Sequence, residues 1–466
     1  MIQLTEKPDP TSETVTRFLW LAIFVLVAAF FVADQHDWSL SRFEFYQAVD
    51  AAGYLDVSGG GLPYRVALVS IAAFGLFLIY RGGGRPLRFR GPMAFLITAL
   101  LAWCVISWQW SAAPVLGAKQ VVVLLACFVC ALGICRRFSP RDLCLLALAV
   151  SGLFMAIGLC AELSLDTFRP WIDEHRFAGT IHPNIQSTYC AVVCLAAACL
   201  ASDGKRRRPL WIALFVIGLI FLVLTKSRTS LAAILVALLI LVMLCKSWRL
   251  KLSAAIGIPF AVCALALIVS LAGGDAGDQF TDAALMGRHE GAQSLTGRVP
   301  LWIELLGYAK QRPLRGYGYG SFWDKQHVQA VSDALTWHIP HAHSAYVDAM
   351  LSIGLIGAAM LIAVLITGMW QAAASYRTTG NVGYAFVFAL LAYAAIHGMT
   401  ESSFVQPTVI PCLAACGLLQ LAFCLRETTP AGGNETIGLR FRDRTTACRL
   451  STTSNRFIIW NRPHHN

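Results

Sequence analysis

The chain has 466 residues, of which 57% are hydrophobic and only 14% are charged, and its formal net charge is +11. Soluble proteins carry about a quarter charged residues, so this composition excludes an ordinary soluble protein. Apolar runs recur along the chain, each close to the roughly 20 residues that cross a bilayer as a helix. Because backbone polar groups in lipid must pair within their own segment, we predict an all-α, polytopic membrane protein.

The apolar runs predict about twelve transmembrane helices. The first run follows a polar start and lacks a good cleavage site, so it is interpreted as a retained span and not as a signal peptide. The tail from Glu427 is polar and rich in arginine, and we expect it to be disordered. The predicted spans lie near residues 18–33, 65–80, 92–110, 115–135, 143–162, 185–202, 209–225, 229–245, 253–272, 345–370, 383–398 and 408–425.

The charges of the connecting segments predict the orientation of these spans. Basic residues gather in connectors that fall on one side of the predicted arrangement, at 81–90, 136–141, 205–208 and 246–251. Cytoplasmic loops carry the excess of Lys and Arg, so we predict that this side and both termini are cytoplasmic. This placement accounts for much of the positive net charge, and we expect no nucleic-acid partner.

The arrangement divides the chain into five regions. Residues 1–17 form the cytoplasmic N-terminus, 18–272 hold spans one to nine, 273–344 form a large outer loop, 345–426 hold spans ten to twelve, and 427–466 form the cytoplasmic tail. A loop as long as 273–344 is usually functional or a small subdomain.

The short link "TKSRTS" places Lys226 and Arg228 on the outer side, against the topology rule. We expect the next helix to begin near Thr229, so its N-terminus adds positive potential to the two cations. Ser227 and Ser230 are hydroxyl donors at the same helix end. The pattern favours a phosphate site, and the alternative is interfacial snorkelling of two long side chains.

The large loop carries further cations in a predicted helix. The sequence "SLTGRVPLWIELLGYAKQRPLRGYGYG" predicts a helix over Thr296–Gln311, with Pro300 in its first turn and Pro313 after its end. Arg298 then lies at the positive end of the helix, where a second phosphate contact is expected. Arg288, which precedes this helix, is a third candidate cation.

Two other patterns in this loop predict packing. An apolar face of the helix is expected to rest on the membrane surface. The segment "GYGYG", 316–320, is interpreted as a turn that lets backbone approach closely, since it lacks the strand and helix that surround a dinucleotide loop. The apolar face consists of Leu301, Trp302, Leu305 and Leu306.

The stretch "WHIPHAHSAYVDAMLSIGLIG", 337–357, contains His338, His341 and His343 directly before the tenth predicted span. Zinc would need further ligands beyond this weak HxH pattern, with Asp348 the nearest candidate, so we predict no metal. A second possibility is that these histidines have only a structural role and form hydrogen bonds within the loop. A general base is favoured, because histidine titrates near neutral pH and nearby cations keep it neutral.

These residues resemble the O-antigen ligase and polymerase superfamily of bacterial envelopes. That family has His, then Asn, Ser or Gln, then nine residues, then GxxG, together with an outer Ser-Arg turn and a Gly-Arg followed by Trp in its large loop. "GTIHPN", 179–184, is similar to a further family element, and the resemblance extends over most of residues 18–425. The matching positions are His343-Ser344 with Gly354 and Gly357, Ser227-Arg228, and Gly297-Arg298 with Trp302.

The resemblance implies an inverting glycosyltransferase that works at the periplasmic face of the bacterial inner membrane without a cofactor, nucleotide sugar or metal. Its donor would be O-antigen on undecaprenyl pyrophosphate and its acceptor a sugar hydroxyl of lipid A–core. Arg228 and Arg298 would hold the pyrophosphate, and His343 would take the acceptor proton. The candidate substrate-binding residues are Lys226, Arg288, Ser344, Lys119 and Glu401, of which the last two are equally well explained as interfacial residues.

Three alternatives remain open on sequence alone. An O-antigen polymerase shares the donor and the membrane face but differs in its acceptor. A protein O-oligosaccharyltransferase would glycosylate serine or threonine. A transporter or flippase would place ionisable residues deep in the spans, whereas the charges here gather at one face. The sugar transferred and the oligomeric state do not follow from the sequence.

Overall fold

The computed structural model describes residues 10–33, 36, 61–81, 84–89, 91–172, 175–203, 207–244, 294–335, 337, 339–402 and 408–424. The chain divides into two compact units, Met1–Cys424 and Leu425–Asn466, and every described residue belongs to the first. The predicted ninth span, Arg288, His338 and the C-terminal tail lie outside the described residues.

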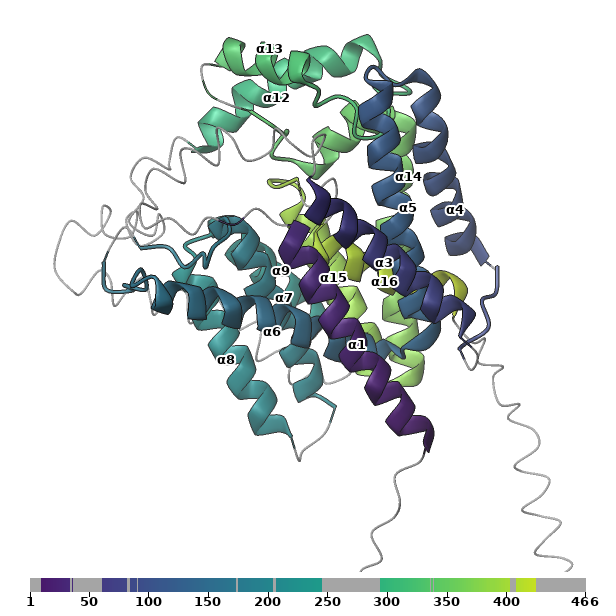
Figure 1. The fold of residues 1–466 in the computed structure, drawn as a ribbon, viewed down its shortest axis with the longest axis vertical. Helices are drawn as coiled ribbons and strands as arrows, with labels where there is room; N and C mark the ends of the chain where they lie inside the picture. Colours follow the sequence, from purple (N-terminus) through teal and green to yellow (C-terminus); the bar gives the residue numbers. More distant parts are fainter. Residues whose placement is uncertain are drawn as a thin grey trace, which may run out of the picture. The chain divides into compact units, whose positions relative to one another are not determined.

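The described residues form helices and no strand, as the composition predicts (Figure 1). Proline occupies the first turn of several of these helices and fits there because its missing N–H is not needed. The helices are α1 Pro10–Ala33, α3 Leu62–Tyr80, α4 Gly91–Ile106, the short η1 Ser107–Trp110, α5 Pro114–Arg137, α6 Pro140–Ser164, α7 Pro183–Ala201, α8 Arg208–Leu224, α9 Arg228–Leu244, α12 Ser294–Gln311, α13 Lys325–Leu335, α14 Ala345–Thr379, α15 Val382–His397 and α16 Val409–Phe423.

Six helical segments are long and apolar enough to cross a membrane: α3, α4 with η1, α5, α6, α7 and α14. Further apolar helices, in α1, α8, α9, α15 and α16, are shorter. Both sets overlap predicted spans, whereas the count of twelve stays a prediction. Large apolar side chains such as Phe24 and Val69 are 71% and 66% exposed, which is expected of helix faces that contact lipid.

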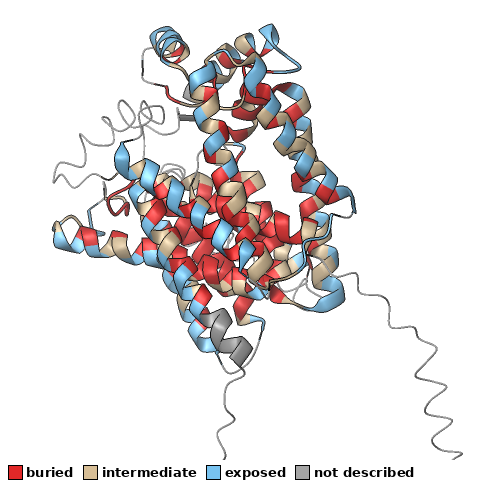
Figure 2. Ribbon diagram, turned by 45° about the vertical axis from the view of Figure 1, so that its right-hand side comes forward, coloured by how far each residue is buried: buried red, intermediate tan, exposed pale blue. Residues whose placement is uncertain are grey.

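The core is built around α7, which packs against α6, α8, α9 and α15. Figure 2 shows that buried residues gather where the helices meet, with exposed residues along the outward faces. Two of the basic connectors also meet, since the N–H of Arg85 donates to the carbonyl of Arg136 at 2.8 Å. Arg141 also forms an ion pair with Asp203, from Nε to Oδ2 at 2.5 Å. These contacts agree with connectors that share one side of the membrane.

Helix α12 begins at Ser294, two residues earlier than expected, so Pro300 lies inside the helix and not in its first turn. The expectation that the apolar face of α12 rests on the membrane surface is wrong for its central residues. Leu301 and Leu305 are fully buried in a cluster with Tyr317, Phe322, Val331, Ile339 and Leu351. The face therefore forms the core of the large loop itself, and only Leu306, at 41% exposure, remains open.

Helix α14 is kinked at Gly354, whose φ of 68° and ψ of −175° are not helical. The turn after α12 fills the kink: Leu355 N–H donates to Pro313 O at 2.8 Å, and Tyr317 N–H donates to Leu351 O at 2.8 Å. The indole of Trp103 donates to Ile353 O at 2.9 Å. Backbone groups that the kink frees inside the protein thus find partners, as they must away from water.

The "GYGYG" prediction of close backbone approach is confirmed. Gly316, Gly318 and Gly320 all have positive φ, which favours glycine. A Cβ on Gly316 would lie 2.6 Å from the backbone of the α14 kink, and a Cβ on Gly318 would lie 2.8 Å from Ser111 Cα. This turn joins the large loop to α14 and to the connection between η1 and α5.

Candidate functional site

The turn between α8 and α9 is short and tightly packed. Lys226 adopts a left-handed φ of 52°, and α9 begins at Arg228, one residue earlier than expected. The Ser230 hydroxyl is buried and lies 2.6 Å from the Ser187 hydroxyl and 3.1 Å from His397 Nε2. The turn thereby places Arg228, half-buried, at the N-terminus of a helix, where the backbone favours an anion.

Arg298 reaches from α12 to the end of α15. Its Nη1 donates to the carbonyl of Thr400 at 2.7 Å, and its Nη2 donates to Glu401 Oε1 at 3.1 Å. The two charged side chains are only 19% and 12% exposed. Solvent screens such a pair less than a surface ion pair, so the guanidinium is held in one orientation.

Two further polar residues extend this contact. Asn184 donates from Nδ2 to Glu401 Oε1 at 3.1 Å and accepts from Arg176 Nη2 at 3.2 Å. Arg176 Nε donates to the carbonyl of Thr225, directly before Lys226, at 3.1 Å. The structure therefore links Arg298 to the turn that carries Arg228. The sequence pointed to Asn184 only through "GTIHPN" and missed Arg176, although an arginine in a predicted outer segment was an available signal.

The histidine loop between α13 and α14 is compact. The rings of His341 and His343 lie 4.1 Å apart between centroids, and His343 has a left-handed φ of 47°. The loop is fixed by Asp348 of α14, whose Oδ1 accepts from Ala342 N–H at 3.2 Å and from Trp323 Nε1 at 2.7 Å. Asp348 therefore supports the loop from within the protein, and His341 and His343 are half-buried residues.

Burial and nearby positive charge keep the two histidines neutral. Burial lowers the pKa of His343 well below its usual value, and His341, Arg298 and His182 lower it further. Burial, followed by the Arg298 charge, lowers the pKa of His341 to about 3. The sequence attributed the neutral imidazoles to the nearby cations alone. In the structure, burial lowers the pKa of both histidines more than the neighbouring charges do. Arg298 and His182 act on His343 because all three lie in one cluster of helix ends.

His182 is the N-cap of α7, where its Nδ1 accepts from Asn184 N–H at 3.2 Å. Ser344 is the N-cap of α14, and it is buried with no side-chain capping bond. The site is thus assembled from the N-terminal parts of α7, α9, α12 and α14 and from the C-terminal end of α15. Several helix N-termini near two arginines make a region suited to an anion.

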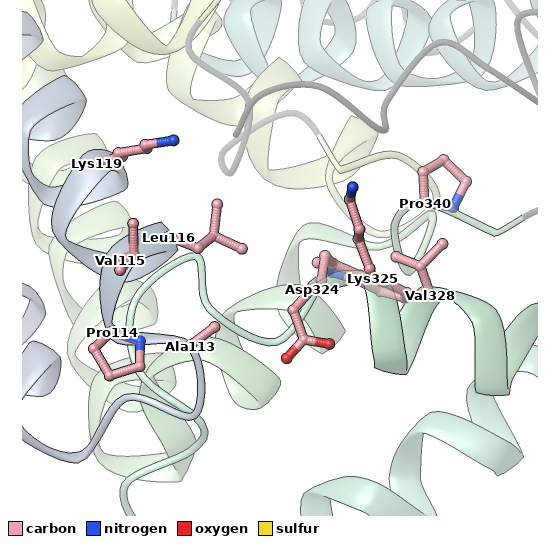
Figure 3. A pocket seen from close by; sticks show the side chains of 10 residues that line it. Ala113, Pro114, Val115, Leu116, Lys119, Asp324, Lys325, Val328 and Pro340 are labelled. Atoms are coloured by element: carbon pink, nitrogen blue, oxygen red, sulfur yellow. The ribbon is translucent and has the colours of Figure 1, made fainter. Parts of the chain in front are cut away.

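Lys119 lies elsewhere, in a pocket of about 320 Å³ between the start of α5 and the segment Trp323–Val328 (Figure 3). Leu116, Val328 and Pro340 give the pocket apolar walls, and Lys325 lines it together with Lys119. Pro340 directly precedes His341, so the pocket borders the histidine loop. Within the described part of the chain, no three His, Cys, Asp or Glu side chains are grouped to hold a metal ion.

Comparison with known proteins finds a match to part of this region. Residues 213–362 match a family model described as O-antigen ligase. The chain is also similar to the exopolysaccharide production protein ExoQ of Rhizobium meliloti (strain 1021), with 28% identity over 295 residues. That match covers 59% of this chain and 64% of the relative's length. The matched family segment contains Arg228, Arg298 and His343, and the resemblance seen in the sequence is confirmed.

Proposed function

We propose that this chain, which carries an O-antigen ligase family domain at residues 213–362, is an inverting glycosyltransferase of the bacterial inner membrane. It would transfer O-antigen glycan from undecaprenyl pyrophosphate to a sugar hydroxyl of lipid A–core at the periplasmic face, with both termini in the cytoplasm. The observation that carries the proposal is the cluster of Arg298 with a neutral His343, in a network that reaches the Arg228 turn.

Each residue has a defined part in the proposed reaction. The acceptor hydroxyl attacks the anomeric carbon, the bond from that carbon to the pyrophosphate oxygen breaks, and the pyrophosphate leaves with the electron pair. His343 accepts the proton of the attacking hydroxyl, a contribution typically of about 10² to 10⁴ in rate. Arg228 and Arg298 stabilise the charge that develops on the pyrophosphate. Lys226 adds a further positive charge, and no metal is required.

The acceptor decides between two candidate functions. The relative's name, an exopolysaccharide production protein, favours polymerisation of a lipid-linked glycan as the second candidate. Expression in a strain that lacks only its O-antigen ligase tests the choice. A restored lipopolysaccharide ladder on a gel supports the ligase, while polymer that remains on undecaprenyl shows a polymerase. Transfer should also continue in EDTA, and activity that EDTA abolishes and a divalent ion restores would contradict metal independence.

The histidines provide the residue-level test. We expect His343→Ala to lose about 10²- to 10⁴-fold in transfer while it still binds the donor, because the phosphate contacts belong to the arginines. His341→Ala is the matched control from the same loop and should have a milder effect. An inactive His341→Ala with a near-normal His343→Ala would show that the base is the other histidine. Loss of donor binding in His343→Ala would assign that residue to positioning the pyrophosphate.

A further inference from the structure

We infer that Arg176, Asn184 and Glu401 form a positioning relay that orients Arg298 toward the donor pyrophosphate and ties it to the Arg228 turn. The inference rests on the proposed function and changes the expected part of Glu401. A carboxylate repels a pyrophosphate, so Glu401 serves the donor through Arg298 and not by contact. The relay joins α7, the end of α15, α12 and the α8–α9 turn.

The two hydrogen bonds of Arg298 leave other N–H groups of its guanidinium for the donor pyrophosphate. A guanidinium has five N–H donors in a planar fork, and two of them bind Thr400 O and Glu401 Oε1. The remaining donors point away from this edge, and a planar fork held at one edge presents its other edge in a fixed direction. Preorganised donors of this kind need no reorganisation when charge develops on the leaving pyrophosphate.

Asn184 sets the direction of the relay. Its Oδ1 accepts from Arg176 and its Nδ2 donates to Glu401, so the amide has one orientation that satisfies both neighbours. A flipped amide would face N–H groups toward Arg176 and an oxygen toward the carboxylate. Because Arg176 also donates to Thr225 O, a shift of Asn184 disturbs both the Arg298 end and the turn that carries Lys226 and Arg228.

An exchange of the two functional groups tests the relay. Asn184→Asp alone places two carboxylates about 3 Å apart, a like-charge contact that displaces Glu401 from Arg298. Glu401→Gln alone keeps an oxygen for Arg298 and removes the charge. The double variant Asn184→Asp with Glu401→Gln removes the like-charge repulsion, leaves the net charge of the pair unchanged, and retains an acceptor oxygen for Arg176 and one for Arg298.

The readouts are the KM and kcat for a lipid-linked glycan donor and the direct binding of undecaprenyl pyrophosphate. We expect Asn184→Asp to raise donor KM by about tenfold or more, and the double variant to return to within about threefold of Glu401→Gln. A merely structural defect would lower the active fraction without moving KM. Asn381→Asp is the matched control, because an aspartate caps α15 at that position as well as asparagine does.

Two outcomes would overturn the relay. One is an Asn184→Asp enzyme with the donor KM of the wild type, and the other is a double variant no better than Asn184→Asp. If Asn184→Asp fails to fold, Asn184→Ala replaces it, since it removes the donor without repulsion, and an unchanged KM there is equally decisive. Direct binding of undecaprenyl pyrophosphate separates failure of the relay from failure of the proposed function. A wild-type protein that binds this lipid but restores no lipopolysaccharide ladder contradicts the ligase function. The relay can still be tested in that case, because the binding of the lipid by the variants can be compared.

Discussion

Substitution of Gly354 by alanine should destabilise the protein strongly, because this residue forms the kink of α14. Its φ of 68° and ψ of −175° lie in a region that only glycine adopts readily, at a cost of about 1 to 3 kcal/mol for other residues. The added Cβ would also overlap the carbonyl group of Leu314 and lie 2.6 Å from Arg315 N. Both neighbours are backbone, so a side-chain rotation cannot relieve the contact.

Relief requires the turn 313–317 to move away from α14. This movement breaks the bonds from Leu355 N–H to Pro313 O and from Tyr317 N–H to Leu351 O, each worth about 1 kcal/mol. Together with the strain, the free energy of unfolding should fall by about 3 to 5 kcal/mol. Transfer activity should fall as well, because α14 begins directly after the histidine loop.

Thermal unfolding of purified protein in detergent and transfer activity at matched protein amounts measure these effects. Gly307→Ala is the control: this glycine lies exposed inside α12, an added Cβ meets no atom within 4 Å, and alanine favours the helix by about 1 kcal/mol. A Gly354→Ala protein that unfolds at the temperature of the wild type would refute the packing argument.

The remaining predictions concern pH and the segment before α7. Because the pKa of His343 is lowered, transfer should stay constant from pH 8 to pH 6, whereas a histidine of ordinary pKa would be only about a quarter neutral at pH 6. Stability should decline as pH falls below about 6.5, since the unfolded state then binds more protons than the folded state, and melting temperatures across this range check the sign. Glu162→Ala should cost about 3 kcal/mol in thermal unfolding, because the fully buried carboxylate accepts from the N–H groups of Ala178 and Gly179 and contacts His175.

The sequence predicted the helical class, and it pointed to Arg228, Arg298 and His343, for clear physical reasons. Hydrophobicity over a bilayer's thickness identifies spans without knowledge of their neighbours. A cation that the predicted topology puts on the outer side, as it does for Arg228 and Arg298, is exceptional enough to be noticed without any knowledge of its neighbours. Partners of these residues were harder to predict, since the contact between Asn184 and Glu401 joins positions 217 residues apart and depends on how α7 and α15 pack.

One prediction failed and one feature was not predicted, because a sequence pattern does not show what a residue packs against. The spacing of Leu301 and Leu305 showed that one face of α12 is covered, but the cover comes from Phe322, Ile339 and Leu351 and not from lipid. The "GxxG" spacing matched Gly354 to a family pattern. Its kink was not predictable, because glycine is compatible with a continuous helix as well as with a positive φ.

The kink in α14 shows where the parts of a chimera between two related proteins should be joined. Helices α12 and α13 and the first turns of α14 share one core: Leu351 packs in the same cluster as Leu301 and Phe322, and Leu351 O and Leu355 N–H bond to the segment after α12. A chimera cut at Ala345, where the predicted span begins, would divide that core between two parents. A cut after Gly357 transplants the histidine loop, its Asp348 support and the whole core together, and such a chimera should retain the folding of its donor module.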